Sequence, residues 1–283
     1  MKYGLYLSNY GEAITVRLLA ELAQNAEEAG WDGFFLWDHI LEARTQKAPM
    51  VDPWIALTAM AMTTQKIKLG TAVTPVARRR PWVLARQTAS LDQLSQGRLI
   101  LGVGLGYPPD VEFGMFGEEA GDRLRAEKLD EGLAILAGLW RGKPFSFEGR
   151  HNRLEKMQFR PASYQQPRIP VWVAGFWPNP APFRRAARWD GVFPLKIGGD
   201  LRGKDIRDIQ DFVAGERLLQ HIPEPQSFDV VVMGFTPGTD PTRARLKVQP
   251  MKEAGATWWL ESLYSKRDSV EKLQERIIQG PPD

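Results

Sequence analysis

The chain alternates between short apolar runs and longer stretches in which apolar residues recur at helical spacing. Short runs rich in branched and aromatic side chains predict buried strands, and the stretches that follow predict amphipathic helices. Strands are expected to begin near Tyr3, Phe34, Ile67, Leu99, Val171, Val192, Val230 and Trp258. Strands that alternate with helices in this way build a closed parallel barrel, so the sequence predicts an α/β fold, a single-domain (β/α)8 TIM barrel.

The alternation is interrupted once, after the fourth predicted helix. Residues 145–150 and 152–154 read as two short extended segments around a turn, which predicts a surface hairpin insertion at about 142–169. No linker divides the chain elsewhere, so we expect one barrel over residues 1–283.

Composition and charge restrict the class of protein. Cysteine is absent, which excludes disulfide scaffolds, thiolate metal sites and a cysteine nucleophile. The 37 basic residues barely exceed the 34 acidic ones, a balance that argues against nucleic-acid binding. The sequence shows no signal-peptide pattern and no apolar run long enough for a membrane span. We therefore expect a soluble, cytoplasmic protein with a small-molecule substrate and neither a nucleic-acid nor a membrane partner.

The ends of the predicted strands hold the candidate chemistry, because barrel enzymes carry their sites there. Of three histidines, only His39 directly follows a predicted strand, beside Asp38, where a catalytic acid or base is expected. A histidine that only caps the strand is the alternative. No second histidine has ligand spacing to His39, so no metal site is predicted.

A glycine-rich segment, residues 102–106, ends the fourth strand. It is not a Rossmann fingerprint, because Tyr107 stands where the third glycine is required and the segment does not follow the first strand. Gly104 and Gly106 more plausibly allow the backbone to approach a planar ring or a phosphate, although a simple turn would also use them.

Several segments together resemble the luciferase-like monooxygenase family of flavin- and deazaflavin-dependent oxidoreductases. The matching positions are 37–39, 52–54, 69–75, 80–81, 91–95, 97–98, 102–104, 113–114, Arg123, 130–131, Gly175 and 190–191. The block from the third to the fourth strand is the most specific of them. This family has a (β/α)8 barrel, in agreement with the strand count.

The resemblance implies a cofactor that lies across the strand ends, with its ring against the third strand. A cis peptide at Ala72–Val73 would support the ring, Asp38 would contact its polar edge and His39 would face its reactive face.

The resemblance also assigns residues to the cofactor's other end and to proton transfer. Arg123, with the backbone amides of Gly175 and Phe176, would bind the phosphate or ribityl chain. Tyr107 occupies a position at which many deazaflavin-dependent relatives carry an acidic residue, which makes it the second candidate for a catalytic residue after His39.

Two chemistries fit this resemblance. In the first, a deazaflavin (coenzyme F-420) or FMN mediates hydride transfer to or from a small organic substrate. In the second, reduced FMN activates dioxygen in a monooxygenase. The chain is short and the Asp38-His39 pair with residues 71–73 is most similar to the deazaflavin branch, so the deazaflavin is favoured.

Two other classes remain open, and the family also suggests an oligomeric state. The protein could be a non-catalytic flavin-binding protein, or an unrelated barrel that binds phosphorylated metabolites through residues 78–80. Relatives commonly form dimers through the second and third helices, so a homodimer is expected, with four apolar residues as candidate contacts. These are Ala56, Met60, Leu84 and Leu91.

Overall fold

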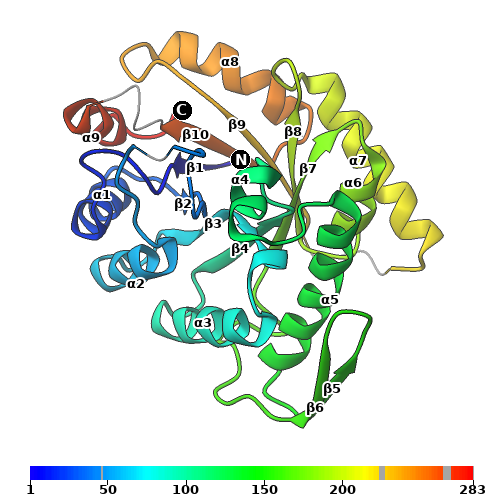
Figure 1. Ribbon diagram of the computed structural model, residues 1–283. Coiled ribbons are helices and arrows are strands. Elements are labelled where there is room, and N and C mark those ends of the chain that lie inside the picture. The colour runs from blue at the N-terminus through cyan, green and yellow to red at the C-terminus, as the bar shows by residue number, and fades with distance from the viewer. Residues whose placement is uncertain (46, 223–226, 264–268, 283) are drawn as a thin grey trace.

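The computed structural model describes residues 1–45, 47–222, 227–263 and 269–282, and in it eight parallel strands close into a barrel (Figure 1). Around the barrel the order is β1, β10, β9, β8, β7, β4, β3 and β2. The strands are β1 Lys2–Leu7, β2 Gly33–Leu36, β3 Lys68–Pro75, β4 Leu99–Gly104, β7 Val171–Trp177, β8 Gly191–Lys196, β9 Asp229–Gly234 and β10 Trp258–Leu263. The predicted (β/α)8 fold is confirmed, and each strand begins within one residue of its expected start.

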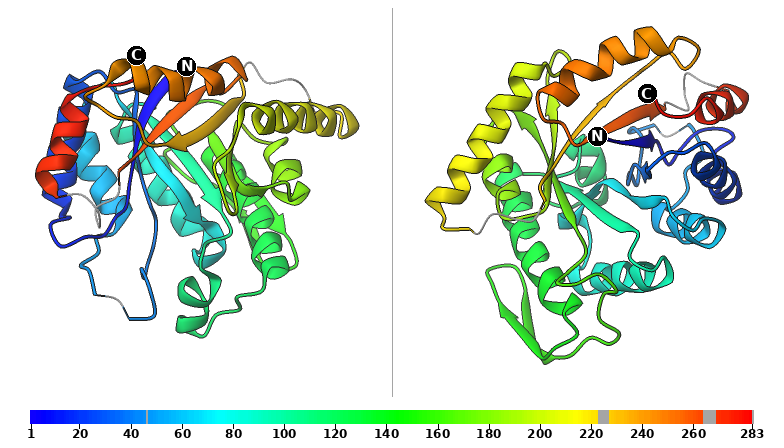
Figure 2. Two further views of the ribbon diagram at one scale, coloured as in Figure 1. Left: turned by 90° about the horizontal axis from the view of Figure 1, so that it is seen from above. Right: turned by 180° about the vertical axis from the view of Figure 1, so that it is seen from behind.

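Helices enclose the strands on the outside of the barrel (Figure 2). They are α1 Val16–Glu28, α2 Pro53–Thr63, α3 Pro81–Leu94, α5 Asp122–Trp140, α6 Pro180–Ala186, α7 Gly203–Leu219, α8 Pro241–Glu253 and α9 Val270–Ile278. Three short elements lie in the loops after β3 and β4: η1 Val76–Arg78, α4 Pro109–Glu112 and η2 Gly114–Phe116. No helix in the described ranges is long and apolar enough to cross a membrane.

Local sequence explains where α2 begins. The Asp52 carboxylate accepts hydrogen bonds from the backbone amides of Trp54 and Ile55, and Pro53 follows at the first helical position. These contacts satisfy amide groups that have no partner inside the helix. From the start of α2, the Trp54 indole donates a hydrogen bond to Asp38, which follows the end of β2.

The interruption of the pattern is a two-stranded antiparallel hairpin, β5 Phe145–Glu148 and β6 Arg153–Met157, outside the barrel (Figure 1). It packs on α5, where a Cβ atom on Gly138 would lie 2.2 Å from the Phe145 ring. The hairpin insertion is therefore confirmed, and it lies away from the ends of the barrel strands.

Large aromatic side chains fill the interior of the barrel. The Phe35 and Trp172 ring centroids lie 4.9 Å apart, and those of Trp172 and Trp258 lie 5.2 Å apart. Phe193 joins the same buried cluster. Since these rings occupy the middle of the barrel, open space is left at the carboxyl ends of the strands.

The four apolar residues expected at a dimer contact lie inside the chain. Ala56, Met60 and Leu84 are 0% exposed and Leu91 is 4% exposed. They face the strands because helical spacing identifies the apolar stripe of a helix, and in a barrel this stripe packs on the sheet. Their assignment to a dimer contact is therefore wrong.

Candidate active site

A cavity of about 620 Å³ opens at the carboxyl ends of the barrel strands. This volume lies within the usual range for small-molecule sites. Residues of β1, β3, β4, β7 and β8 line it, together with residues from the loops at the ends of the strands, including the loop after β2. The lining residues used below are Tyr6, Tyr10, Trp37, Asp38, His39, Ala72, Val73, Gly104, Gly106, Tyr107, Glu112, Asp122, Arg125, Ala174, Gly175, Phe176, Phe193, Leu195 and Ile197.

The cavity brings together every predicted site residue except one. Arg123 does not line it, and its side chain is 89% exposed and paired with Glu127. Arg125, two positions further along α5, is buried and points inward instead. Its guanidinium donates to the backbone oxygens of Leu105 and Gly106, both at 2.7 Å, and so holds the glycine-rich segment in place.

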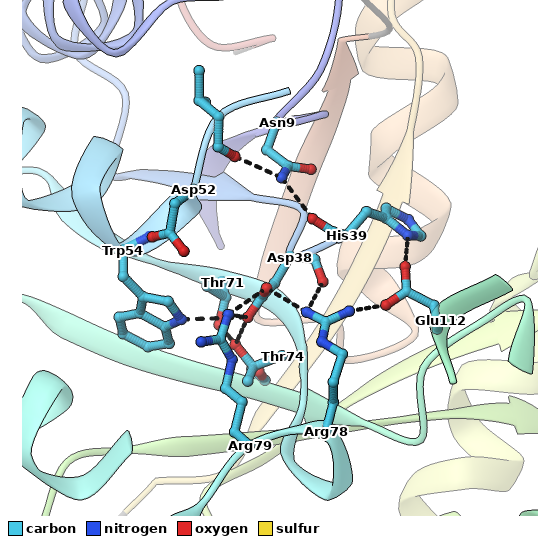
Figure 3. Close-up of polar contacts among 12 residues, drawn as sticks. Asn9, Asp38, His39, Asp52, Trp54, Thr71, Thr74, Arg78, Arg79 and Glu112 are labelled. Atoms are coloured by element: carbon cyan, nitrogen blue, oxygen red, sulfur yellow. Dashed lines mark hydrogen bonds and ion pairs between the residues drawn. The ribbon is translucent and has the colours of Figure 1, made fainter. Parts of the chain in front are cut away.

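Asp38 is the centre of a buried ion-pair cluster (Figure 3). Oδ1 accepts from the guanidinium groups of Arg78 and Arg79, each at 2.7 Å, and Oδ2 accepts from Thr74 Oγ1 at 2.8 Å and Trp54 Nε1 at 3.3 Å. Protein donors thus occupy both carboxylate oxygens. We infer that Asp38 mainly organises this side of the cavity, while its contact with a cofactor ring stays a prediction.

The same contacts decide the role of the arginine cluster. The Arg78 and Arg79 side chains are 8% and 19% exposed, and both pair with Asp38. They neutralise a buried carboxylate of the chain itself, because an unpaired charge is costly to bury. The alternative of an anion site for phosphorylated metabolites at residues 78–80 is therefore wrong for these two guanidinium groups.

His39 and Glu112 form a hydrogen-bonded pair at the cavity wall (Figure 3). His39 Nδ1 lies 2.7 Å from Glu112 Oε1, and the other oxygen of Glu112 pairs with Arg78. The Glu112 side chain is fully buried. Asn9 Nδ2 donates to the His39 backbone oxygen at 3.0 Å, so the backbone of His39 is held as well.

These surroundings favour a neutral imidazole. Burial, together with the positive charge of Arg78, lowers the pKa of His39 to about 4. With Glu112 as acceptor, the ring proton lies on Nδ1, and Nε2 is the nitrogen left for a ligand in the cavity. A neutral imidazole oriented by a carboxylate is the arrangement that general bases use.

Tyr107 lies at the mouth of the cavity. Its side chain is 67% exposed, and its ring packs edge-on against Phe176 with centroids 6.1 Å apart. Tyr107 is therefore more exposed than His39, whose side chain is 24% exposed, and the catalytic role of Tyr107 stays a prediction.

One side of the cavity, on β3, β4, β7 and the loop after β4, is rich in small residues beside Val73 and Phe176. The small residues are Ala72, Gly104, Gly106, Ala174 and Gly175, and we call this side the backbone surface. Gly106 has φ +86°, which glycine adopts readily, and a Cβ atom on Gly104 would lie 2.8 Å from Val73 Cγ2. The predicted cis peptide at Ala72–Val73 is present, beside an irregularity in the pairing of β3 with β4. This surface, together with the backbone of Phe176, fits the predicted cofactor ring.

Sequence reasoning missed Glu112, Arg125 and Tyr6. Glu112 lies between the apolar residues Val111 and Phe113. These apolar neighbours are the one sequence feature that indicates a buried carboxylate at Glu112, which is 0% exposed. Tyr6 lies on the strand that the sequence predicts to begin near Tyr3. Its alternation with buried Leu5 and Leu7 indicates that it faces the barrel interior. Among the described residues, no cluster of three or more side chains could hold a metal ion.

Comparisons with known proteins agree with this geometry. A family model described as luciferase-like monooxygenase matches residues 3–236. The F420-dependent glucose-6-phosphate dehydrogenase of Nakamurella multipartita is 36% identical over 174 residues, which cover 60% of this chain and 49% of that protein. The matches thus span about half the length of this and similar curated relatives.

Solved structures with low identity share the fold. The coenzyme F420 dependent tetrahydromethanopterin reductase from Methanopyrus kandleri superposes with a TM-score of 0.77 at 18% identity, over 98% of this chain and 96% of that one. The oxygenating constituent of 3,6-diketocamphane monooxygenase from Pseudomonas putida, in complex with FMN, has a TM-score of 0.77 at 16% identity, over 99% and 96% of the two chains. At these identities the likeness concerns the barrel alone.

Proposed function

The chain belongs to the luciferase-like monooxygenase family, and we propose that it is an oxidoreductase that uses a deazaflavin (F-420) or FMN for hydride transfer to or from a small organic substrate. The observation that carries this proposal is the cavity itself. The backbone surface on β3, β4 and β7, rich in small residues, lines the same cavity as a neutral histidine that a buried carboxylate orients.

The residues that would hold the cofactor are those of the backbone surface. Ala72 and Val73 would support the ring, Gly104 and Gly106 would allow its close approach, and Gly175 with Phe176 would face the phosphate end. The bound cofactor supplies the hydride chemistry, and the protein supplies position, electrostatics and exclusion of water.

His39 would move the proton that accompanies the hydride. In alcohol oxidation, Nε2 accepts the hydroxyl proton, while Glu112 stabilises the resulting positive imidazolium through Nδ1. In carbonyl reduction, the same nitrogen returns a proton to the oxygen. Arg78 pairs with both Asp38 and Glu112, so the ion-pair cluster fixes the carboxylate that orients His39.

The deazaflavin is the favoured cofactor, since the relative from Nakamurella multipartita, whose match covers 60% of this chain, is named as F420-dependent. The runner-up is an FMN-dependent monooxygenase that activates dioxygen, which a structural neighbour in complex with FMN keeps open. Separate titrations with the deazaflavin and with FMN, each followed by gel filtration, test the choice. We expect the deazaflavin to be retained with a shifted absorption band.

The other outcomes of these titrations are equally informative. Retention of FMN alone would contradict the preference and favour the monooxygenase. Retention of neither cofactor would contradict the proposal, and a retained cofactor that no substrate reduces or oxidises would favour the non-catalytic flavin-binding alternative.

A homodimer and a cytoplasmic location belong to the proposal as well. The outer faces of α2 and α3 carry exposed apolar side chains, with Ile55 61% and Met62 66% exposed on α2. Val83 and Leu94 extend this apolar surface on α3. If a second copy covers this surface, Met62→Asp should convert the dimer to a monomer in light scattering. An unchanged mass would place any contact elsewhere.

A further inference from the structure

Another part of the cavity wall, on β1, β8 and the segment after β2, contains a continuous row of aromatic rings. Ring centroids lie 5.8 Å apart between Phe193 and Tyr6, 5.4 Å between Tyr6 and Trp37, and 5.4 Å between Trp37 and His39. Tyr10 packs edge-on against both Trp37 and His39. Leu195 and Ile197 extend this wall at the end of β8. We call these seven residues the aromatic wall.

The aromatic wall contains no cation in the described part of the chain. Among the described residues, Arg125 is the only arginine that lines the cavity, and its guanidinium donates hydrogen bonds to the oxygens of Leu105, Gly106, Ala120 and Asp122. Lys196, next to Leu195, does not line the cavity and pairs with Asp205 at 2.8 Å. A phosphate or carboxylate placed here would meet no ionised partner among the described residues of the wall, and tight anion sites require such a partner.

The polar groups of the wall suit a neutral oxygen instead. Nε2 of His39 is the free nitrogen of a neutral ring. Tyr6 lines the cavity, its hydroxyl has no hydrogen-bond partner among the described residues, and burial raises the pKa of Tyr6 above its ordinary value. A neutral phenol can donate to a carbonyl or hydroxyl oxygen.

We propose that the substrate is an uncharged, largely apolar alcohol or ketone that lies between the cofactor and the aromatic wall, with its oxygen at His39 and Tyr6. This inference rests on the proposed function and names its substrate class. In the oxidative direction, the hydroxyl proton passes to His39 Nε2 as the carbinol carbon gives a hydride, with both electrons, to the oxidised deazaflavin. The alcohol becomes a ketone and the deazaflavin is reduced. A phosphorylated sugar, the substrate in the name of the relative from Nakamurella multipartita, does not fit this wall.

A matched pair of ligands tests the inference. Calorimetry should measure the affinities of three ligands: 4-oxocyclohexanecarboxylate, its methyl ester and glucose 6-phosphate. Each should be titrated into the protein with and without bound deazaflavin. We expect the ester to bind at least about tenfold more tightly than the carboxylate, because burial of an unpaired anion is unfavourable. Equal or tighter binding of the carboxylate or of glucose 6-phosphate would overturn the inference.

Variants connect the preference to the wall. Phe193→Ala should lower the affinity for the ester by about tenfold, because a buried apolar contact is lost. Tyr6→Phe should lower this affinity by a few-fold, because one hydrogen bond is lost. Neither variant should change the affinity for the deazaflavin by more than about twofold, because the ring is proposed to bind on the backbone surface and not on the aromatic wall. Unchanged ester affinity in both variants would contradict a substrate site at the wall.

Two controls separate this inference from the proposed function. Failure of the deazaflavin to bind would overturn the proposed function alone, since the ligand preference is also measured without it. Lys266 and Arg267 lie outside the described residues. The double variant Lys266→Ala/Arg267→Ala should bind the ester as the wild type does. An anion preference that disappears in this variant would place an anion site there and overturn the inference.

Discussion

Replacement of Asp38 by asparagine should destabilise the protein far more than loss of an ordinary ion pair. The Asp38 carboxylate is 1% exposed and accepts hydrogen bonds from Arg78, Arg79, Thr74 and Trp54. Asparagine is nearly the same size, but it removes the negative charge and turns one acceptor into a donor. Among the described residues, Arg79 would then lose its counter-charge, and Arg78 would keep only its pair with Glu112.

The size of the effect follows from this arrangement. Removal of one partner from a buried ion pair typically costs about 3–5 kcal/mol, because the remaining charge stays desolvated. We therefore expect Asp38→Asn to lower the free energy of unfolding by about 3–5 kcal/mol in urea denaturation. Asp208→Asn is the matched control, since Asp208 pairs with Lys204 on the exposed face of α7. This change should cost about 0.5 kcal/mol or less.

The reasoning would be refuted if Asp38→Asn and Asp208→Asn lowered stability equally. The variant also separates two roles of Asp38. If deazaflavin affinity falls while stability is unchanged, Asp38 contacts the cofactor, as the family resemblance implies. If stability falls and the folded fraction binds the deazaflavin normally, its role is to hold Arg78 and Arg79.

Three further predictions follow from the site. His39→Asn should lower turnover by about 10²–10⁴-fold, the usual range for general acid–base catalysis. Its affinity for the deazaflavin should stay within a few-fold of the wild-type value in a fluorescence titration. Normal turnover would leave Tyr107 as the candidate for the catalytic residue. Because the pKa of His39 falls from 6.5 to about 4 on folding, its neutral form stabilises the protein fully above pH 6.5, and about 3 kcal/mol should be lost as the pH falls from 6.5 to about 4. His39→Asn should lack this part of the pH dependence in urea denaturation, and an identical slope would contradict the assigned cause. Gly106 has φ +86°, and a Cβ atom there would lie 2.9 Å from the Phe113 ring, so Gly106→Ala should lower stability in thermal unfolding by more than about 1 kcal/mol. The control Gly215→Ala on α7, where a Cβ atom meets nothing within 4 Å, should not lower the stability of the protein.

The fold could be predicted from sequence because the barrel repeats one pattern. Each buried strand is a short run of branched or aromatic residues, and each helix carries an apolar stripe, so errors at single boundaries do not change the count. The helical stripe failed as a guide to the dimer contact. Met60 and Leu84 keep helical spacing because they pack on the strands, and only the exposure of Ile55 and Met62 identifies the outer face.

The candidate site was predicted where it depends on strand ends and missed where it depends on loops. His39 directly follows a strand, so its position in the chain fixes its position in the barrel. Glu112 contacts His39 only because the loop after β4 folds back over the cavity, and Arg78 reaches both Asp38 and Glu112 from the loop after β3. Such long-range pairs leave no periodic signal. Arg123 and Arg125 differ by two positions on one helix, and the direction of each side chain decided which one reaches the cavity.

The most direct test of the proposed function is a crystal structure of the protein with bound deazaflavin. Our account predicts that the ring lies on the backbone at Ala72–Val73, Gly104 and Gly175, with its hydride-carrying carbon directed toward the space in front of His39 Nε2. A ring bound outside this cavity, or one whose reactive carbon faces away from His39, would contradict it.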